Sequence, residues 1–407
     1  MAILQTYNDV RAYMDRLGLF SMDLGLGRME SFWAGHHAPS FPIVHVVGTN
    51  GKGSTSTFFE SVAREHGLRT GLFTSPHFVT PRERIKVDGR MLSREDWLRL
   101  ANQVLETPGG DTLTYFEFQT CLAMLAFMDK GVDVAIMEAG MGGRYDATNV
   151  FSPQLTLFTP IGLDHEKVLG STINAIAQDK AGAMHADGVA VTGGQEPEAF
   201  AVLQGRARAL GIEFHEAREV AEEVASPLGL RGEHQRDNAR LAVAGWRLFA
   251  GLYGVLPDDD AMALGMEQAF IPGRLHMVRP EGMPQFILDG AHNHHALVAL
   301  GRELRHEGIE PDAIVFNCMA DKTLDAMLPL LRGFGAGPIL CPGMAFERAA
   351  APEDTARAIG DRAVAYFDLR AALEPLRGTC GVVLICGSLY LLASFYELYP
   401  EFLRLKE

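Results

Sequence analysis

The 407-residue sequence contains only five cysteines, an odd number, and none of them forms a Cys-x-x-Cys pair. This usage is typical of reduced, buried thiols, and it argues against a disulfide framework or a zinc site. The sequence also lacks a lysine- or arginine-rich block, since 36 basic residues stand against 51 acidic ones and the formal net charge is −15. Because nucleic-acid-binding proteins usually present a basic face, we expect no nucleic-acid partner.

Long hydrophobic runs are missing as well. The longest candidate, residues 382–395, is interrupted by Gly387 and Ser388, so we expect no membrane span. Residues 1–20 have the pattern of an amphipathic helix and lack the basic start and apolar stretch of a signal peptide. We therefore expect a soluble, cytoplasmic protein without a membrane partner. Nothing in the sequence demands a dimer, and a monomer is the default expectation.

The sequence does contain a regular alternation of short apolar runs and helical patterns, with 47% apolar and 21% charged residues. This alternation predicts an α/β protein with mainly parallel sheets, and the length favours two domains. In the first two-thirds of the chain we expect strands at residues 43–47, 70–74, 132–137, 155–160 and 189–192. Helices are expected between them, including residues 54–65, 94–106 and 116–130.

A break follows near Phe270, where the segments Ile271 to Arg274 and Pro280 to Pro284 have the chemistry of a linker. After this break the alternation restarts, with strands expected at residues 285–288, 313–316, 338–341, 363–367 and 382–386. We predict a P-loop-type, mainly parallel sheet domain followed by a smaller Rossmann-like domain. The expected boundaries are 1–272 for the first domain, 273–284 for the linker and 285–407 for the second domain.

The most informative segment is Val46-Val47-Gly48-Thr49-Asn50-Gly51-Lys52-Gly53-Ser54-Thr55, which joins an apolar run to a helical pattern. A glycine turn between a strand and a helix places backbone N–H groups around an anion, and Lys52 adds a positive charge. Ser54 or Thr55 can face a magnesium ion. The strict Walker pattern needs glycine at position 46 and a hydroxyl directly after the lysine, whereas this sequence has Val46 and Gly53 there. The segment is therefore a variant P-loop, and it predicts binding of a polyphosphate.

Two polar groups follow later strands of the first domain. Glu138 ends a buried-looking strand ahead of a glycine-rich loop, and His165 comes shortly after the next strand. In an open α/β sheet these strand ends meet the P-loop at the ligand-binding edge. A carboxylate there can bind magnesium beside a triphosphate, and His165 is a second candidate ligand. The alternatives are a carboxylate that caps the next turn and a structural histidine.

Weaker signals gain weight only because they occur together. Ser75, Thr114 and Asp289 each follow a strand or open a helix, where simple capping is the alternative explanation. Judged by its surroundings in the sequence alone, Lys180 reads as an ordinary lysine on the surface of a helix.

Taken in order, these segments resemble folylpolyglutamate synthase and the bifunctional dihydrofolate synthase, members of the Mur ligase superfamily. The resemblance runs from Met22-Asp23-Leu24-Gly25-Leu26 to Cys386-Gly387-Ser388-Leu389-Tyr390. It is carried by the P-loop and by the segments at 74–77, 114–118, 142–149, 164–165, 179–182, 234–239, 272–274 and 291–293. So many segments in one order are specific for this family.

The resemblance implies sites for ATP and for two magnesium ions. The ATP phosphates would be cradled by Asn50, Gly51, Lys52, Gly53 and Ser54. The nucleotide site would be completed across the domain boundary by Asn238, Arg274 and Asp289. The magnesium ligands would be Ser75, Glu138, His165 and Lys180. Lys180 corresponds to a lysine that this family carbamylates, which converts a cation into a carboxylate that can support the second metal.

The resemblance also implies where the organic substrates bind. A folate or dihydropteroate acceptor would contact Asp23, Thr114, Tyr115, Phe116, Glu117, Tyr145, Asp146 and Ala147. The glutamate and acyl-phosphate side would involve His292, Asp321 and Lys322. The chain departs from the family pattern in three places: Tyr145 replaces a common leucine, His294 a usual proline, and Asp179 a glutamate. Tyr145 leaves the fine shape of the pterin pocket open, and the other two departures are mild.

The implied reaction is ATP-dependent ligation of L-glutamate to a folate, and also to dihydropteroate, through an acyl phosphate. Lys52, Lys180, His165 and His292 would be the residues closest to the chemistry. The sequence leaves a single-activity enzyme open, because no residue separates the two acceptors. A P-loop nucleotide switch without ligase chemistry is a less favoured alternative. A cell-wall ligase of the same superfamily is disfavoured because only 47 residues precede Gly48.

Overall fold

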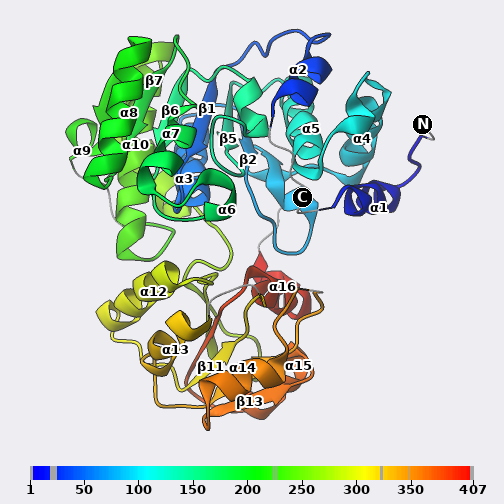
Figure 1. Cartoon of the computed structure of the whole chain (residues 1–407), viewed down its shortest axis with the longest axis vertical. Helices are drawn as coiled ribbons and strands as arrows, with labels where there is room; N and C mark the ends of the chain where they lie inside the picture. The colour runs from blue at the N-terminus through cyan, green and yellow to red at the C-terminus, as the bar shows by residue number, and fades with distance from the viewer. Residues whose placement is uncertain are drawn as a thin grey trace.

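The computed structural model describes residues 3–18, 25–222, 224, 227–320, 324–346 and 348–403. Two α/β domains follow one another along the long axis of the molecule, the larger one formed by the first two-thirds of the chain (Figure 1). Each domain is built around its own sheet, and most strand pairs in both sheets are parallel. The predicted fold class is therefore confirmed.

Within the described residues, the sheet of the first domain has eight strands in the order β4-β3-β2-β5-β1-β6-β7-β8. Only the pairs β2–β3 and β3–β4 are antiparallel. The strands are β1 Ile43–Val47, β2 Thr70–Phe73, β3 Ile85–Val87, β4 Arg90–Met91, β5 Val134–Glu138, β6 Leu155–Phe158, β7 Val189–Thr192 and β8 Phe214–Glu216. The strand that feeds the P-loop, β1, thus lies between β5 and β6.

Helices cover both faces of this sheet, because alternate residues of its strands point to opposite sides. Val44 and Val46 of β1 belong to the core under α3, α10 and α11, whereas Ile43 and Val47 belong to cores on the other face. The helices are α1 Tyr7–Leu17, α2 Gly27–Trp33, α3 Lys52–Glu65, α4 Arg94–Glu106, α5 Tyr115–Lys130, α6 Glu166–Leu169, α7 Ile173–Ala181, α8 Pro197–Leu210, α9 Ala217–Val220, α10 Glu233–Tyr253 and α11 Asp259–Gln268.

The second domain has a six-stranded sheet in the order β13-β12-β11-β14-β10-β9, counted over the residues that the structure describes. Only the edge strand β9 runs antiparallel to its neighbour. The strands are β9 His276–Val278, β10 Gln285–Leu288, β11 Ala313–Phe316, β12 Ile339–Pro342, β13 Ala363–Tyr366 and β14 Val382–Cys386. One face is covered by α12 His294–His306, α13 Leu324–Arg332 and α14 Pro352–Ile359, and the other by α15 Leu369–Leu373 and α16 Leu389–Leu398.

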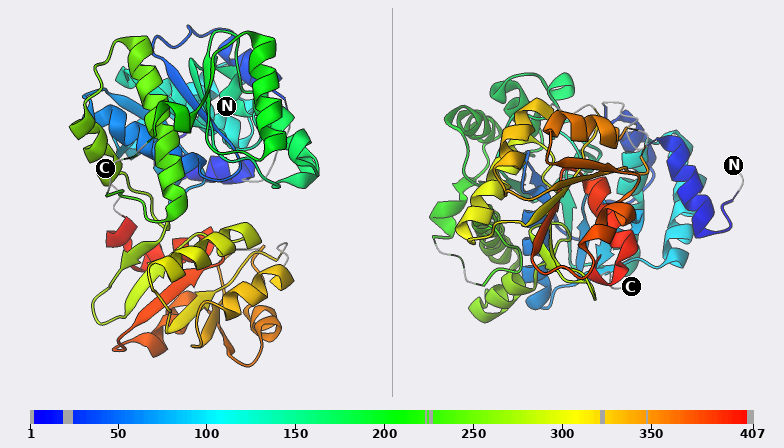
Figure 2. Two further views of the ribbon diagram at one scale, coloured as in Figure 1. Left: turned by 90° about the vertical axis from the view of Figure 1, so that its left-hand side faces the viewer. Right: turned by 90° about the horizontal axis from the view of Figure 1, so that it is seen from below.

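The domain boundary differs in one respect from the expected linker at 273–284. Residues 276–278 of that segment form β9, which pairs with β10 as part of the second sheet. The segment is therefore not only a connection, since its first half already contributes a strand. Two views at right angles show this connection beside α16 (Figure 2).

The two domains touch near this connection. The ring of Phe78, on the loop after β2, lies edge-on to the ring of Tyr396 on α16, with centroids 5.5 Å apart. On the other side, the N–H of Glu233 at the start of α10 donates to the carboxylate of Glu303 on α12 at 2.5 Å. These contacts place α12 and α16 opposite the end of the first sheet where its parallel strands finish and the P-loop lies.

Among the residues that the structure describes, none of the helices combines the length and the apolar composition that a membrane span requires.

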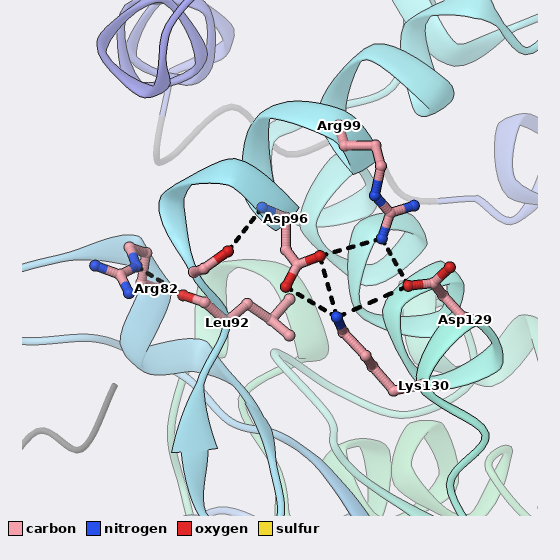
Figure 3. Close-up of polar contacts among 7 residues, drawn as sticks. Arg82, Leu92, Asp96, Arg99, Asp129 and Lys130 are labelled. Carbon is pink, nitrogen blue, oxygen red and sulfur yellow. Dashed lines mark hydrogen bonds and ion pairs between the residues drawn. The ribbon is translucent and has the colours of Figure 1, made fainter.

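An ion-pair network joins the start of α4 to the end of α5 (Figure 3). The carboxylate of Asp96 binds the amine of Lys130 at 3.0 Å and the guanidinium of Arg99 at 3.2 Å. Arg99 also binds Asp129 at 2.6 Å, and Ser93 caps α4 by accepting from the Asp96 N–H. Burial raises the pKa of Asp96, but the hydrogen bonds from Lys130 and Arg99 outweigh that effect and leave the pKa below its usual value.

We predict that Asp96→Asn lowers the free energy of unfolding by about 0.5–1 kcal/mol at neutral pH, because partly exposed ion pairs contribute little individually. A carboxyl group with a lowered pKa stabilises the fold above its unfolded pKa of about 3.9 and loses that effect as the pH falls through its folded pKa. The difference in urea unfolding between variant and wild type should therefore be smaller at pH 3 than at pH 7.

The matched control is Asp354→Asn, which removes an ion pair with Arg357 whose side chains are 69% and 76% exposed. This control should change stability by a few tenths of a kcal/mol at most. Equal effects of the two substitutions would contradict a specific contribution from the α4–α5 network.

Candidate active site

The P-loop lies at the carboxyl end of the central strand β1, as predicted. Gly51 caps α3 with a left-handed backbone (φ 90°), and Lys52 is the first residue of that helix. A Cβ atom at Gly51 would overlap the amide oxygen of Asn238 on α10. The structure thus brings together two elements of the predicted ATP site, and only glycine leaves room for the loop against α10.

Two lysine amines converge on one carbonyl oxygen of this loop. The amine of Lys52 donates to the carbonyl oxygens of Gly48 and Thr49, both at 3.2 Å. The amine of Lys180, on α7, donates to the same Gly48 oxygen at 2.8 Å. Gly48 itself lies against Thr159 of the loop after β6. The P-loop therefore holds two lysine amines beside the position where a phosphate would bind.

Lys180 is buried, with 4% of its surface exposed, so the expectation of a helix-surface lysine was wrong. Burial, together with the charge of Lys52, lowers the pKa of Lys180 to about 7. Both effects disfavour the charged form of an amine. At neutral pH, then, a substantial fraction of Lys180 carries a free electron pair on its amine.

Glu138 lies directly against the start of α3. Its carboxylate accepts a hydrogen bond from the N–H of Ser75 at 2.8 Å, and a Cβ atom at Gly53 would lie 3.4 Å from the same oxygen. Burial raises the pKa of Glu138, while the charge of Lys52 and the hydrogen bond from Ser75 oppose this effect. Two of the predicted magnesium ligands, Ser75 and Glu138, are therefore neighbours at the P-loop.

His165 lies on the other side of the P-loop, because β6 and β5 flank β1 on opposite sides. Its side chain is 48% exposed, its backbone is left-handed (φ 51°), and its N–H donates to Asp164. In the part of the chain that the structure describes, no three His, Cys, Asp or Glu side chains already form a metal cluster. The predicted magnesium ligands thus lie on both sides of the P-loop, and the described side chains do not converge on a single metal position.

The donor set nevertheless fits a magnesium–nucleotide complex. A hydroxyl, a carboxylate and an imidazole are available around a cradle of backbone N–H groups at a helix N-terminus. The hydroxyl of Thr55 in this cradle is buried and has no hydrogen-bond partner among the described residues. A bound phosphate would supply hydrogen-bond acceptors for the Thr55 hydroxyl and the backbone N–H groups, and its cation would bind the carboxylate.

The predicted residues of the second domain also face this region. Asp289 follows β10 and accepts hydrogen bonds from the N–H groups of Leu275 and Ala291 at 3.0 and 2.9 Å. Burial raises the pKa of Asp289, and the neighbouring charge of Arg274 opposes it. The charge of Arg274 also acts on Glu138 of the first domain. His292 is half-buried, and its ring Nδ1 lies 2.8 Å from the Gly290 carbonyl oxygen.

Among the residues predicted to contact the folate or dihydropteroate, Thr114 caps a helix, so the helix-capping explanation holds for it. Thr114 and Glu117 form a reciprocal capping box at the start of α5. Glu117 also accepts hydrogen bonds from Nε and Nη2 of Arg28, both at 2.9 Å, in an ion pair that nothing in the sequence indicated. The ring of Phe116 packs against Gly140 of the glycine-rich loop, 2.5 Å from where a Cβ atom would be. These contacts join α5 to that loop.

Asp146 is buried, and its hydrogen-bond partners belong to its own loop. Its carboxylate accepts from the N–H groups of Met141 and Thr148 and from the Thr148 hydroxyl. That hydroxyl in turn lies 2.7 Å from the ring Nε2 of buried His45, whose pKa burial lowers to about 3. Asp146 thus organises the glycine-rich loop in this structure. Tyr145 next to it is 48% exposed, and Ala147 opens a short 3₁₀ turn.

Three predicted positions lie outside the described residues: Asp23, Asp321 and Lys322. Conversely, the structure reveals Arg84, which sequence reasoning missed. Arg84 is buried, donates to the ring of His77 at 2.8 Å, and lies 5.6 Å from the ring centre of Tyr115. An arginine in a charged Pro-Arg-Glu-Arg segment gives no sequence signal of burial, so only the structure could identify it.

Comparisons with known proteins bear on this geometry. Residues 46–245 match the Mur ligase middle domain, and residues 273–389 match the Mur ligase glutamate ligase domain. The two matches cover the P-loop domain and the second sheet in the order that the structure shows. The fold and the site therefore define an ATP-dependent ligase of the Mur ligase type.

The full-length relatives narrow this class. The Bacillus subtilis protein named dihydrofolate synthase/folylpolyglutamate synthase is 34% identical over 95% of this chain and 98% of its own length. The chain belongs to the folylpolyglutamate synthase/dihydrofolate synthase family. Two solved structures agree with this assignment. E. coli FolC in complex with DHPP and ADP is 26% identical, with a TM-score of 0.85 over 98% of this chain and 99% of that chain. The Yersinia pestis bifunctional folylpolyglutamate synthase/dihydrofolate synthase complexed with AMPPNP and Mn ion is 27% identical, with a TM-score of 0.84 over 98% of this chain and 99% of that chain.

We predict that Gly48→Ala weakens binding of a non-hydrolysable ATP analogue about tenfold or more, on the order of 1.4 kcal/mol. The added Cβ atom would overlap the hydroxyl of Thr159 and lie 2.8 Å from its carbonyl oxygen, so the loop after β6 and the P-loop must separate. Isothermal titration calorimetry measures the effect. Overpacking should also cost about 1–3 kcal/mol of stability.

Gly205→Ala on α8 is the matched control, because a Cβ atom there meets no other atom within 4 Å. It should leave nucleotide binding unchanged and slightly stabilise the helix. Unaltered binding by Gly48→Ala would show that the close contact with Thr159 is unimportant for the nucleotide site.

Proposed function

We propose that this enzyme uses ATP to join L-glutamate to the carboxylate of a folate, and that it also accepts dihydropteroate. The observation that carries the proposal is the convergence of Lys52 and Lys180 on the Gly48 carbonyl, with Glu138 against the same helix start. The related proteins support the substrates: one relative is named for both activities, and solved relatives contain ADP, DHPP or AMPPNP.

The chemistry explains why a ligase needs this site. A carboxylate is a poor electrophile, so an oxygen of the acceptor carboxylate first attacks the γ-phosphorus of ATP, and ADP leaves. The amino group of glutamate then attacks the carbonyl carbon of the acyl phosphate, and inorganic phosphate leaves. Phosphoryl transfer depends on positioning and charge neutralisation more than on acid–base catalysis. Lys52 and, from the second domain, Arg274 supply positive charge for that purpose.

Ser75, Glu138 and His165 are the residues that would hold magnesium in this proposal. When bound, magnesium neutralises charge on the transferring phosphoryl group. Burial raises the pKa of Glu138, but the charge of Lys52 and the hydrogen bond from Ser75 favour the carboxylate form that a magnesium ligand needs. The neighbouring Ser75 N–H fixes the orientation of that carboxylate.

We extend the proposal to carbamylation of Lys180. The uncharged amine adds to carbon dioxide, forming an N–C bond and releasing one proton, and the product is a carboxylate. The lowered pKa favours this reaction, because it leaves the amine uncharged near neutral pH. A carbamate would also replace the repulsion between Lys180 and Lys52 with an attraction. It would add a second anionic oxygen ligand near the P-loop.

The choice between one acceptor and two is open to a direct assay. Dihydropteroate and tetrahydrofolate share the pterin end and differ in the tail that carries the reacting carboxylate. Side-by-side measurement of glutamate-dependent ADP formation with each acceptor distinguishes a bifunctional enzyme from a folylpolyglutamate synthase or a dihydrofolate synthase. A monomeric, cytoplasmic enzyme without nucleic-acid or membrane partners stays a prediction.

We predict that Lys52→Ala and Glu138→Ala each lower ADP formation that depends on both acceptor and glutamate by about 100-fold or more. The reason is the loss of charge stabilisation at the phosphate in one variant and at the cation in the other. Glu95→Ala, an exposed substitution on α4, serves as the control and should keep full activity.

Retained activity in both active-site variants would overturn the ligase assignment. ATP hydrolysis that ignores acceptor and glutamate but responds to another protein would instead favour a nucleotide switch.

We also predict a carbamate signal on Lys180 in ¹³C-bicarbonate that rises between pH 6 and pH 8 and is absent from Lys180→Ala. With a pKa of about 7, roughly nine-tenths of Lys180 is uncharged at pH 8, against well below one-hundredth of an ordinary lysine. ¹³C NMR gives the measurement, and ADP formation should rise over the same range. An absent signal at pH 8 in the wild type would contradict carbamylation.

A further inference from the structure

The segment 159–162 connects β6 to the loop that carries His165, and two side chains hold it from opposite sides. His165 lies seven residues beyond the end of β6, whereas Glu138 is the last residue of β5 itself. A strand fixes Glu138 through its ladder of hydrogen bonds, but His165 needs another anchor. The anchors are Thr49 of the P-loop and Gln195, which follows β7.

Thr49 binds the segment from the P-loop. Its hydroxyl donates to the Gly162 carbonyl oxygen at 3.1 Å and accepts from the Gly162 N–H at 3.0 Å. The N–H of Thr49 donates to the Pro160 carbonyl oxygen at 3.0 Å. One residue therefore makes three hydrogen bonds between the P-loop and the approach to His165.

Gln195 binds the same segment from the other side. Its side-chain oxygen accepts from the Ile161 N–H at 2.9 Å, and its side-chain nitrogen donates to the Thr159 carbonyl oxygen at 3.0 Å. The nitrogen also lies 3.0 Å from the hydroxyl of Thr192, at the end of β7. Both ends of the amide are thus used, and a side chain without both a donor and an acceptor cannot replace it.

These contacts account for every backbone N–H of the segment. The N–H of Thr159 donates to Val47, that of Ile161 to Gln195 and that of Gly162 to Thr49, while Pro160 has no N–H. A backbone with all its donors paired has few ways to shift without leaving a buried group unsatisfied. The segment is therefore fixed relative to both the P-loop and β7.

We propose that Thr49 and Gln195 form a clamp that sets the position of His165 relative to the P-loop, and that Gln195 is a positioning residue for the metal–nucleotide site. Gln195 acts through the backbone and touches neither the nucleotide nor the metal. The proposal rests on the proposed function, in which His165 is a metal ligand. Partners that orient a metal ligand commonly matter 10–100-fold for metal affinity, so the effect should be measurable (about 10-fold or more).

The test uses Gln195→Leu, which keeps the approximate size and removes both hydrogen-bonding groups, and Gln195→Glu, which keeps the acceptor for Ile161 and loses the donor to Thr159. Gln204→Leu, at a half-buried position on α8, is the matched control. Two quantities are measured besides activity: binding of Mn²⁺ to the complex with a non-hydrolysable ATP analogue, and amide hydrogen exchange over residues 159–165.

Gln195→Leu should bind Mn²⁺ about 10-fold or more weakly, with the metal-free nucleotide affinity nearly unchanged and faster exchange at Ile161 and Gly162. Gln195→Glu should be intermediate, and Gln204→Leu should match the wild type. Unchanged Mn²⁺ affinity in Gln195→Leu would overturn the proposal. So would a parallel loss of nucleotide affinity, metal affinity and melting temperature, because that pattern reports general destabilisation.

His165→Ala separates this proposal from the proposed function. If His165→Ala binds Mn²⁺ as the wild type does, the assignment of His165 as a ligand fails, and the clamp loses its role at the metal. If His165→Ala weakens Mn²⁺ binding and Gln195→Leu does not, the proposed function stands and the clamp is rejected.

Discussion

The active site depends on holding two lysine amines against one backbone carbonyl inside an acidic protein. Lys52 and Lys180 both donate to Gly48, although burial and mutual repulsion oppose placing two cations there. Two features reduce this repulsion: the pKa of Lys180 is lowered, and the carboxylate of Glu138 lies beside Lys52. A polyphosphate, which carries several negative charges, is the ligand that such a site stabilises. The close packing requires glycine at position 48, because a side chain there would overlap Thr159.

The sheet topology determines where the remaining groups can lie. Because β1 runs between β5 and β6, the groups that follow these two strands reach the P-loop from opposite sides. Glu138 is held by its own strand, whereas His165 depends on a loop anchored by side chains from the P-loop and from the end of β7. Arg274 lies beside Asp289 at the start of the second domain, and its charge acts on Glu138 of the first domain.

Much of the fold could be predicted, because short apolar runs that alternate with helical patterns mark buried parallel strands. All ten strands expected from the sequence are present, with ends shifted by at most a few residues. The missed strands β3, β4, β8 and β9 are two or three residues long, and they contain residues such as Lys86, Arg90 and His276. Short strands of this kind carry no periodic signal, since their pairing is decided by the neighbouring strand. For the same reason, β9 was expected to be linker.

The sequence by itself determined the polyphosphate loop, the order of the motifs and the family, because these depend on residue type and local spacing. It could not determine the burial of Lys180, whose bond to Gly48 joins residues 132 positions apart. Nor could it show that Asp146 serves its own loop, that Arg28 pairs with Glu117, or that Gln195 holds the approach to His165. These roles arise from long-range contacts that change solvation and hydrogen bonding, and only the tertiary structure decides them.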